Sequence, residues 1–527
     1  MNYRRRCQAF TTLAALGLAA CTNSDTGEEV PPSAETHLHS ERGGIGLVVP
    51  GEQSAGLTTP AVVDPRRSLA VTEQAILNRF TLQRVLDQLA AQSSVPGLTG
   101  LQLFRQLWDT QNPAPGILGV GEHCTDDGGR LNDFPYACRP EEGAQASVDP
   151  FNPPGNPNSY RALGLFNRFD LAPANGENCG EYRMVFGKNT ASPGRNFIIF
   201  EAVLTNPRPE RGLDGCWPVA NFWASLSEES NVNTRATRLE NFFFLGFPGF
   251  DPVVHIDNYG NATDRTTGQV RTNQFIRPQW LLREFKLRED CGEFGCQLLF
   301  ARVTVKTNPA EELFNEASTH PRAPAFRTFF IDSIDELAQG NINTFNYTVP
   351  DIFNHGESES QTPSRSYASQ FANSPNFRAA IQARINTLGL SLTPNQLVAR
   401  AQALACAGCH QFSNNADVGF GSQRFPSSLG FTHTSEQTES SADGPRHLLS
   451  PALTGTFLPH RKTVLEGFLN KPTTCSHDVC DLGGPLQSSC SPCATVVCDS
   501  DSFCCTTEWD SACVDAAQAL CARTTCP

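Results

Sequence analysis

Three neighbouring residues at the end of a predicted helix could do chemistry together. Cys406 and Cys409 are thiols three residues apart, and His410 follows the second one directly. On a helical turn this spacing brings both thiols to one side of the chain. They could form a disulfide with each other, or both add to double bonds at one edge of a ligand. The adjacent imidazole can donate a lone pair to a metal.

The segment matches Cys-x-x-Cys-His, the attachment signature of c-type haem. In that chemistry the two thiols add across the vinyl groups of the porphyrin, and the histidine becomes the proximal iron ligand. A chain with this many cysteines and histidines contains the pattern by chance about once in sixty. The sequence predicts one covalent haem c, bound by Cys406 and Cys409 as thioethers and by His410. The alternative is a Cys406–Cys409 disulfide beside an incidental histidine.

The elements around the motif resemble those of single-haem cytochrome c domains. A helix over Pro394–Ala405, capped by Thr393, leads into the motif. Leu448–His460 then resembles the Pro-x-Leu segment of that family, and Lys462–Leu469 resembles its closing C-terminal helix. The resemblance covers about eighty residues. It implies a small all-α haem domain, for which we predict the boundaries 367–470.

The far side of the iron departs from the family pattern, which usually places a methionine there. Met184 is the only methionine outside the predicted signal peptide, and it lies far from the motif in the sequence. The alternatives are a histidine of the same domain, Met184, or an open position. His460 is the leading candidate because it follows Phe-Leu-Pro, near where related domains present this ligand. His433 and His447 are the other two histidines to consider.

The first residues predict export. Arg4, Arg5 and Arg6 precede an apolar run that is too short to span a bilayer, and the run ends in Leu-Ala-Ala-Cys21. This ending resembles the lipobox of bacterial lipoproteins, which implies lipidation of Cys21 after removal of residues 1–20. An ordinary signal peptide is the alternative. We therefore expect a protein tethered to the membrane through 21–66, in the cell envelope, as an outer-membrane lipoprotein facing the periplasm or the cell surface.

The remaining cysteines predict disulfides, since an exported chain meets an oxidising compartment. Ten cysteines crowd into 471–527, where a small module with little core would need covalent cross-links. Zinc at Cys490-x-x-Cys493 is the competing interpretation. Pairing of near neighbours in the rest of the chain predicts three further disulfides, Cys124–Cys138, Cys179–Cys216 and Cys291–Cys296.

The long stretch 67–355 predicts an α+β body of unknown function. Runs of β-forming residues predict strands over Glu181–Phe186 and Arg195–Leu204 and a hairpin of Trp280–Leu287 with Gln297–Lys306. A polar gap over 356–366 predicts a linker to the haem domain. The chain is then multidomain: an α+β body, an all-α haem domain and a disulfide-rich module. The body's carboxylates, among them Asp170, Glu181 and Glu201, have no partner that the sequence identifies.

These features together predict an exported, lipid-anchored haem protein in electron transfer, with a redox partner protein that the sequence does not name. Two alternatives stay open: a haem peroxidase-like enzyme, and a haem-free surface or interaction lipoprotein held by disulfides. The formal net charge of −14 argues against nucleic acid as a partner, because phosphate backbones are repelled.

Cys21→Ser tests the predicted anchor. Without the thiol there is no lipid acceptor, so the chain should be soluble or unprocessed in membrane fractionation. A variant that stays tightly bound to membranes would contradict the lipobox interpretation.

Overall fold

The computed structural model describes residues 60–110, 129–136, 139–151, 155–190, 194–246, 249–293, 295–471, 474–521 and 526. The predicted signal peptide, Cys21, most of the tether and the predicted pair Cys124–Cys138 lie outside these ranges. Among the helices of the described ranges, none is long and apolar enough to cross a membrane.

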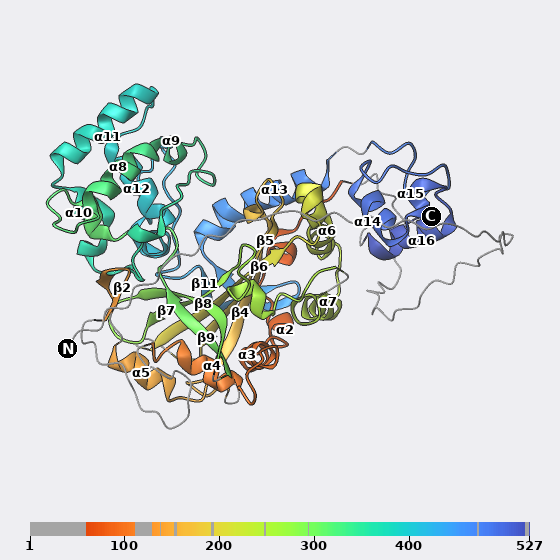
Figure 1. Ribbon diagram of the computed structural model, residues 1–527, viewed down its shortest axis with the longest axis horizontal. Coiled ribbons are helices and arrows are strands. Elements are labelled where there is room, and N and C mark those ends of the chain that lie inside the picture. Colours follow the sequence, from red (N-terminus) through yellow and green to blue (C-terminus); the bar gives the residue numbers. More distant parts are fainter. Residues whose placement is uncertain are drawn as a thin grey trace, which may run out of the picture. The chain divides into compact units, whose positions relative to one another are not determined.

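An eight-stranded antiparallel sheet forms the centre of the body (Figure 1). Its strands follow the order β1-β4-β5-β6-β7-β8-β10, and β9 pairs with β8 from Glu284 to Gly292. The strands are β1 Ala70–Val71, β4 Tyr160–Arg168, β5 Asn178–Lys188, β6 Arg195–Thr205, β7 Gln269–Phe275, β8 Leu281–Gly292, β9 Gly295–Val303 and β10 Glu357–Glu359.

The two faces of this sheet differ because side chains alternate along each strand. Tyr182, Met184 and Phe186 of β5 point into a core of aromatic and aliphatic residues, whereas Arg183 between them points to the other face. Helices cover the apolar face and bury it. The helices of this half are α1 Pro65–Ser68, α2 Gln74–Leu77, α3 Leu82–Ala91, α4 Gly100–Gln106, α5 Pro140–Ala146, α6 Trp217–Ser225 and α7 Val232–Phe244.

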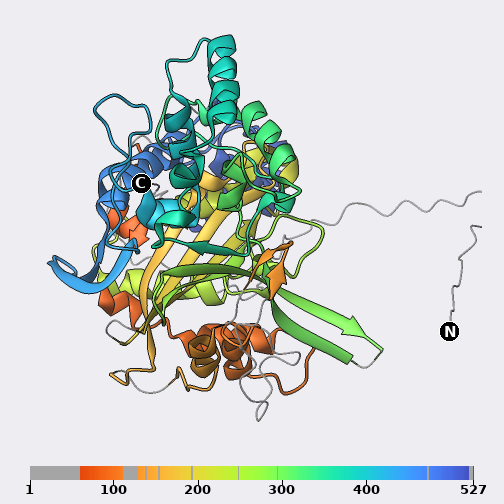
Figure 2. The same cartoon turned by 90° about the vertical axis from the view of Figure 1, so that its left-hand side faces the viewer.

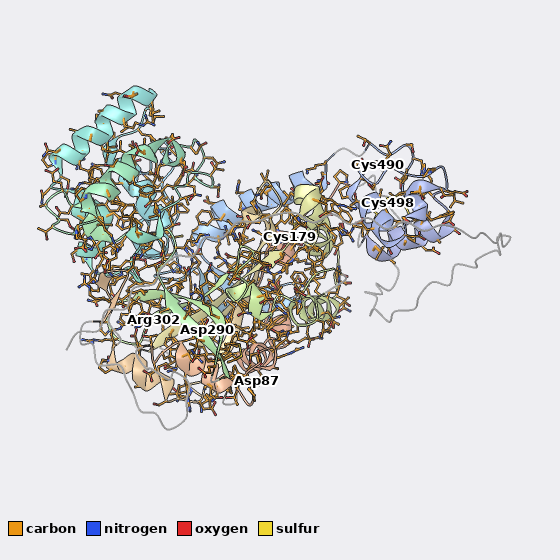
Figure 3. All side chains as sticks on the ribbon, in the orientation of Figure 1. Asp87, Cys179, Asp290, Arg302, Cys490 and Cys498 are labelled. Atoms are coloured by element: carbon orange, nitrogen blue, oxygen red, sulfur yellow. A yellow bond between two sulfur atoms is a disulfide. The ribbon has the colours of Figure 1, made fainter. Side chains whose placement is uncertain are left out.

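The strands predicted from the sequence are confirmed as β5, β6 and the β8–β9 hairpin. Figure 2 shows this hairpin extending beyond the rest of the sheet. Cys291 and Cys296 form the predicted disulfide at its tip, and the predicted Cys179–Cys216 disulfide is also present. Figure 3 marks Cys179 within the body.

A second hydrophobic core lies under a group of helices that Figure 1 shows clustered together. Its phenylalanines come from both sides of the predicted domain boundary, since Phe314, Phe326 and Phe330 pack with Phe371 and Phe377. The predicted cap is confirmed, because the Thr393 hydroxyl accepts from the Gln396 amide. The helices are α8 Ala323–Asp332, α9 Ile334–Leu337, α10 Tyr367–Phe371, α11 Pro375–Leu388 and α12 Pro394–Leu404.

Two expectations about the middle of the chain are wrong. The predicted linker 356–366 contains β10, an edge strand that pairs with β8. The predicted all-α domain 367–470 is not a separate unit: its first helices share a core with residues 310–353. Its second half contains the hairpin β11 Thr434–Ser441 with β12 Gly444–Leu449, followed by α13 Leu458–Leu469, which packs on the body. The reason is that neither half buries its apolar residues within the segment alone.

The C-terminal module is held by disulfides, as predicted, with α14 Pro492–Ser500, α15 Phe503–Thr506 and α16 Ser511–Leu520 around a buried Trp509. Cys490 and Cys493 each have a disulfide partner, so the zinc interpretation does not hold. Figure 3 marks Cys490 and Cys498 in this module. The pairs are Cys475–Cys490, Cys480–Cys526, Cys493–Cys521, Cys498–Cys505 and Cys504–Cys513.

The shared core predicts that a fragment spanning 367–470 does not fold alone. Without 310–353 and the sheet, it would expose the apolar faces of α11, α12 and α13 to water. Circular dichroism of the purified fragment should show no cooperative thermal transition. A sharp thermal transition would contradict this prediction and would show that 367–470 folds as a separate domain.

Candidate functional site

The motif residues sit on a tight turn directly after α12. The helix ends at Leu404, Ala405 is extended, and the chain then turns through a single π-helical turn, η7 Gly408–Phe412. Such π turns occur often at functional sites. Gly408 is required by the packing, since a Cβ there would lie 1.6 Å from the Gln402 carbonyl oxygen.

Strand β10 holds this turn in place through hydrogen bonds of Ser358. The Ser358 hydroxyl accepts from the Ala407 amide at 2.9 Å and donates to Asn308 Oδ1 at 2.8 Å. The segment predicted as a linker therefore joins the motif to the edge of the sheet. This contact places the Cys406 and Cys409 turn over the sheet rather than in a domain of its own.

His410 is oriented by a backbone carbonyl. Its Nδ1 lies 2.8 Å from the Phe431 carbonyl oxygen, which also accepts from Asn273 Nδ2 of β7 at 3.0 Å. Because a carbonyl can only accept, Nδ1 carries the proton and Nε2 keeps its lone pair. Metal-binding histidines are commonly held in this way, with the remote nitrogen bonded to a carbonyl and the other nitrogen left for the metal.

Phe431 has an unusual backbone conformation that makes this contact possible. Its φ of 71° is left-handed, which is rare for an aromatic residue and costs on the order of 1–3 kcal/mol. The ring stacks on Trp280 at 5.4 Å between centroids, and the two lie nearly parallel. The stacking on the sheet compensates for part of the strain and holds the carbonyl toward His410.

Cys406 and Cys409 are both unpaired, whereas every other cysteine of the described ranges is in a disulfide. The alternative Cys406–Cys409 disulfide is therefore not formed. Burial raises the pKa of Cys406 to about 11 and that of Cys409 to about 12. Both groups are thus neutral thiols at physiological pH, which are slow to oxidise because the thiolate is the reactive form.

His433 is the one predicted distal candidate that contacts the motif within the described chain. Its ring lies 4.8 Å from that of His410 between centroids and is nearly perpendicular to it. Its Nε2 is 3.3 Å from Cys409 Sγ, and its Nδ1 is 2.8 Å from Ser450 Oγ. The structure thus brings together four of the residues that the sequence singled out.

The other three distal candidates lie elsewhere. Met184 is fully buried in the core on the apolar face of β5, and its neighbour Arg183 faces the side of the motif. His447 is buried on β12, where its amide donates to the Thr72 carbonyl. His460 is half-buried on α13, and no described contact joins it to the motif.

A row of alternating charges crosses the sheet near the motif. Arg183 Nη1 of β5 lies 3.2 Å from Glu201 of β6, and Arg271 of β7 lies 2.7 Å from Glu201 and 2.8 Å from Glu284 of β8. Burial opposes ionisation of Glu201, but Arg183 and Arg271 outweigh it and hold its pKa at about 2. Arg271 in turn lies close enough to Cys406 and His410 to influence both electrostatically.

A second charge cluster adjoins Cys409 and His433. Arg168 donates two hydrogen bonds of 2.9 Å to the Asp170 carboxylate, and Arg461 Nε of α13 is 3.7 Å from the same group. Arg461 is only 8% exposed, and burial together with Arg168 holds its pKa well below its ordinary value. The buried Arg461 and the half-buried Arg168 therefore share one carboxylate beside the motif.

Sequence reasoning missed the partners of these carboxylates. Asp170, Glu181 and Glu201 had no identifiable partner in the sequence, whereas the structure gives each of them at least one arginine. A signal was present in the strand pattern, because charged residues recur with a period of two at Glu181 and Arg183 within otherwise apolar runs. Their cross-strand pairing, however, depends on register that only the fold supplies.

Asp170→Asn tests the second cluster. The pKa of Asp170 is about 2 instead of 3.8, so its carboxylate stabilises the fold by about 2 kcal/mol above pH 4. Since the folded pKa is the lower one, this stabilisation is complete above the unfolded pKa and is lost as the pH falls towards 2. Urea unfolding should show the variant less stable at pH 7 and the difference shrinking between pH 4 and pH 2. An equal difference at every pH would contradict the assignment.

Comparison with known proteins identifies one segment. Residues 473–526 match the family model described as "Domain of unknown function (DUF8252)". This match coincides with the disulfide-held module and does not extend to the body or the motif. No curated protein and no solved structure matches the chain.

Proposed function

We propose that this protein is an exported, lipid-anchored c-type haem protein that transfers electrons. The observation that carries the proposal is the state of Cys406 and Cys409. They are unpaired thiols in a chain that pairs its other described cysteines, and they stand beside a histidine whose Nε2 keeps its lone pair. This combination is what covalent haem attachment requires.

The donor set fits a haem by its chemistry. Each thiol can add across one vinyl group: a sulfur–carbon bond forms, and the thiol hydrogen passes to the neighbouring vinyl carbon, with no net oxidation. The neutral Nε2 of His410 is an ordinary iron ligand in proteins. Cys406, Cys409 and His410 would hold the group, which when bound supplies a one-electron couple at iron.

The chain's own residues then have three tasks. The Phe431 carbonyl keeps the proton of His410 on Nδ1, so the ligand nitrogen stays available. Ser358 and Asn273 fix the turn and the carbonyl to the sheet, so the site changes little in shape when its charge changes. The charges of the half-buried Arg271 and the buried Arg461 act on the site through a medium of lower dielectric constant than water, where a fixed charge has more effect.

The setting of the protein supports export. Seven disulfides within the described residues favour an oxidising compartment, and the attachment chemistry of c-type haem also takes place outside the cytoplasmic membrane. We propose Cys21 as the lipid anchor in the cell envelope, facing the periplasm or the cell surface. The electron-transfer partner is a redox protein whose docking surface is complementary to an acidic chain.

Two other functions are separated by the same measurements. A peroxidase-like enzyme needs an open iron position for peroxide and would show a high-spin iron spectrum. A haem-free surface lipoprotein would be colourless, with the disulfide-held module as its main feature.

The proposed function predicts one covalent haem per chain in a host with haem-maturation machinery. Cys406→Ser combined with Cys409→Ser should remove the haem-stained band from a denaturing gel, since both attachment sites are lost. The matched control is Cys291→Ser with Cys296→Ser, which removes two cysteines at an exposed hairpin tip and should leave the band intact. A colourless protein with the native sequence would contradict the proposal.

A further inference from the structure

His433 is held in place by Ser450. The Ser450 amide donates to the His433 carbonyl at 2.9 Å, and the Ser450 hydroxyl is 2.8 Å from His433 Nδ1. Ser450 is completely buried, and its hydroxyl also accepts from the Leu453 amide at 3.2 Å. A second π-helical turn, η8 Leu453–Phe457, begins there and leads into α13. The orientation of the His433 ring is therefore set from the segment that precedes α13.

The other nitrogen of His433 faces Cys409. Its Nε2 lies 3.3 Å from Cys409 Sγ, while Nδ1 lies 2.8 Å from Ser450 Oγ. The two contacts fix the ring from both sides, with Nε2 turned towards the motif.

We propose that His433 is the second axial ligand of the haem iron, and that Ser450 is its positioning residue; this inference rests on the function proposed above. Nε2 is the ring nitrogen that faces Cys409, so a group bound through the Cys409 sulfur would lie next to it. The His410 ring lies 4.8 Å away between centroids, so both imidazoles could hold the same iron.

The location of His433 favours it over His460, the leading candidate from the sequence. Within the described chain, His433 contacts Cys409 and His410 directly, whereas no described contact joins His460 to either residue. Met184 is fully buried in the core on the opposite face of the sheet, and a shift to the motif would have to break β5.

This ligation separates an electron carrier from a peroxidase. If both His410 and His433 held the iron, no position would be open to peroxide and the iron would be low-spin. Its reduction potential would be lower than that of a His/Met cytochrome, because methionine ligation raises the potential.

The test is the spectrum of the full-length haem protein and of His433→Ala. The unchanged protein should be low-spin in both oxidation states, without the sulfur-to-iron charge-transfer band of methionine ligation. His433→Ala should become high-spin, and added imidazole should restore the low-spin spectrum by filling the vacated position. His460→Ala and His447→Ala are the matched controls and should remain low-spin.

Ser450 provides a second, independent readout. Ser450→Ala should give a mixture of high-spin and low-spin iron with covalent haem retained, and Ser450→Thr, which keeps the hydroxyl, should restore the low-spin form. A structural role alone would lower stability without changing the spin state of the folded protein.

The possible outcomes distinguish the two proposals. Absence of covalent haem from the unchanged protein contradicts the proposed function. Covalent haem with a low-spin spectrum that survives His433→Ala, or a methionine band in the unchanged protein, overturns the assignment of His433 alone. If His433→Ala does not accumulate, the methionine band still decides: its presence overturns the assignment, whereas a low-spin spectrum without it, kept in both control variants, supports it.

Discussion

The hydrogen bond from His410 to the Phe431 carbonyl is the constraint on which the site depends. It fixes the protonated nitrogen of His410, and it does so from a residue in a left-handed conformation that only its surroundings stabilise. Those surroundings belong to the sheet, since Trp280 stacks on the Phe431 ring and Asn273 donates to the same carbonyl. The geometry of the motif is therefore a property of the whole body.

The sheet has a different task on each face. One face is an apolar core, and its burial supplies the stability that the charged groups of the other face cost. The polar face keeps arginines and carboxylates in pairs because an unpaired buried charge is expensive. The charge of Arg461 is less fully neutralised, since it shares the Asp170 carboxylate with Arg168. A cationic surplus beside Cys409 and His433 would favour the more reduced form of a group bound there.

Local signals in the sequence were sufficient for α12, for strands β5 and β6, for the β8–β9 hairpin and for two of the body's disulfides. Thr393 as the N-cap and Pro394 as the first helical residue mark the start of α12, and the spacing of Cys291 and Cys296 fits a hairpin tip. The cysteine density of the tail was likewise enough to predict its disulfides, although not their connectivity. The motif itself was readable because its three residues are adjacent in the chain.

What could not be read are contacts between distant segments. β10 is only three residues long and polar, so its sequence resembles a linker. Its place at the edge of the sheet follows from pairing with β8, some seventy residues earlier in the chain. The choice of His433 over His460 depends on Ser450 and on the packing around the motif, which no local pattern encodes. The carboxylate partners follow from strand register in the same way.

The central claim is that Cys406 and Cys409 bind one haem covalently, and the most direct measurement is peptide mass spectrometry. A protease digest of the full-length protein, made in a host that attaches c-type haem, should yield the peptide with both cysteines heavier by one haem. The same peptide recovered only with free thiols, or with a disulfide between the two cysteines, would contradict the account.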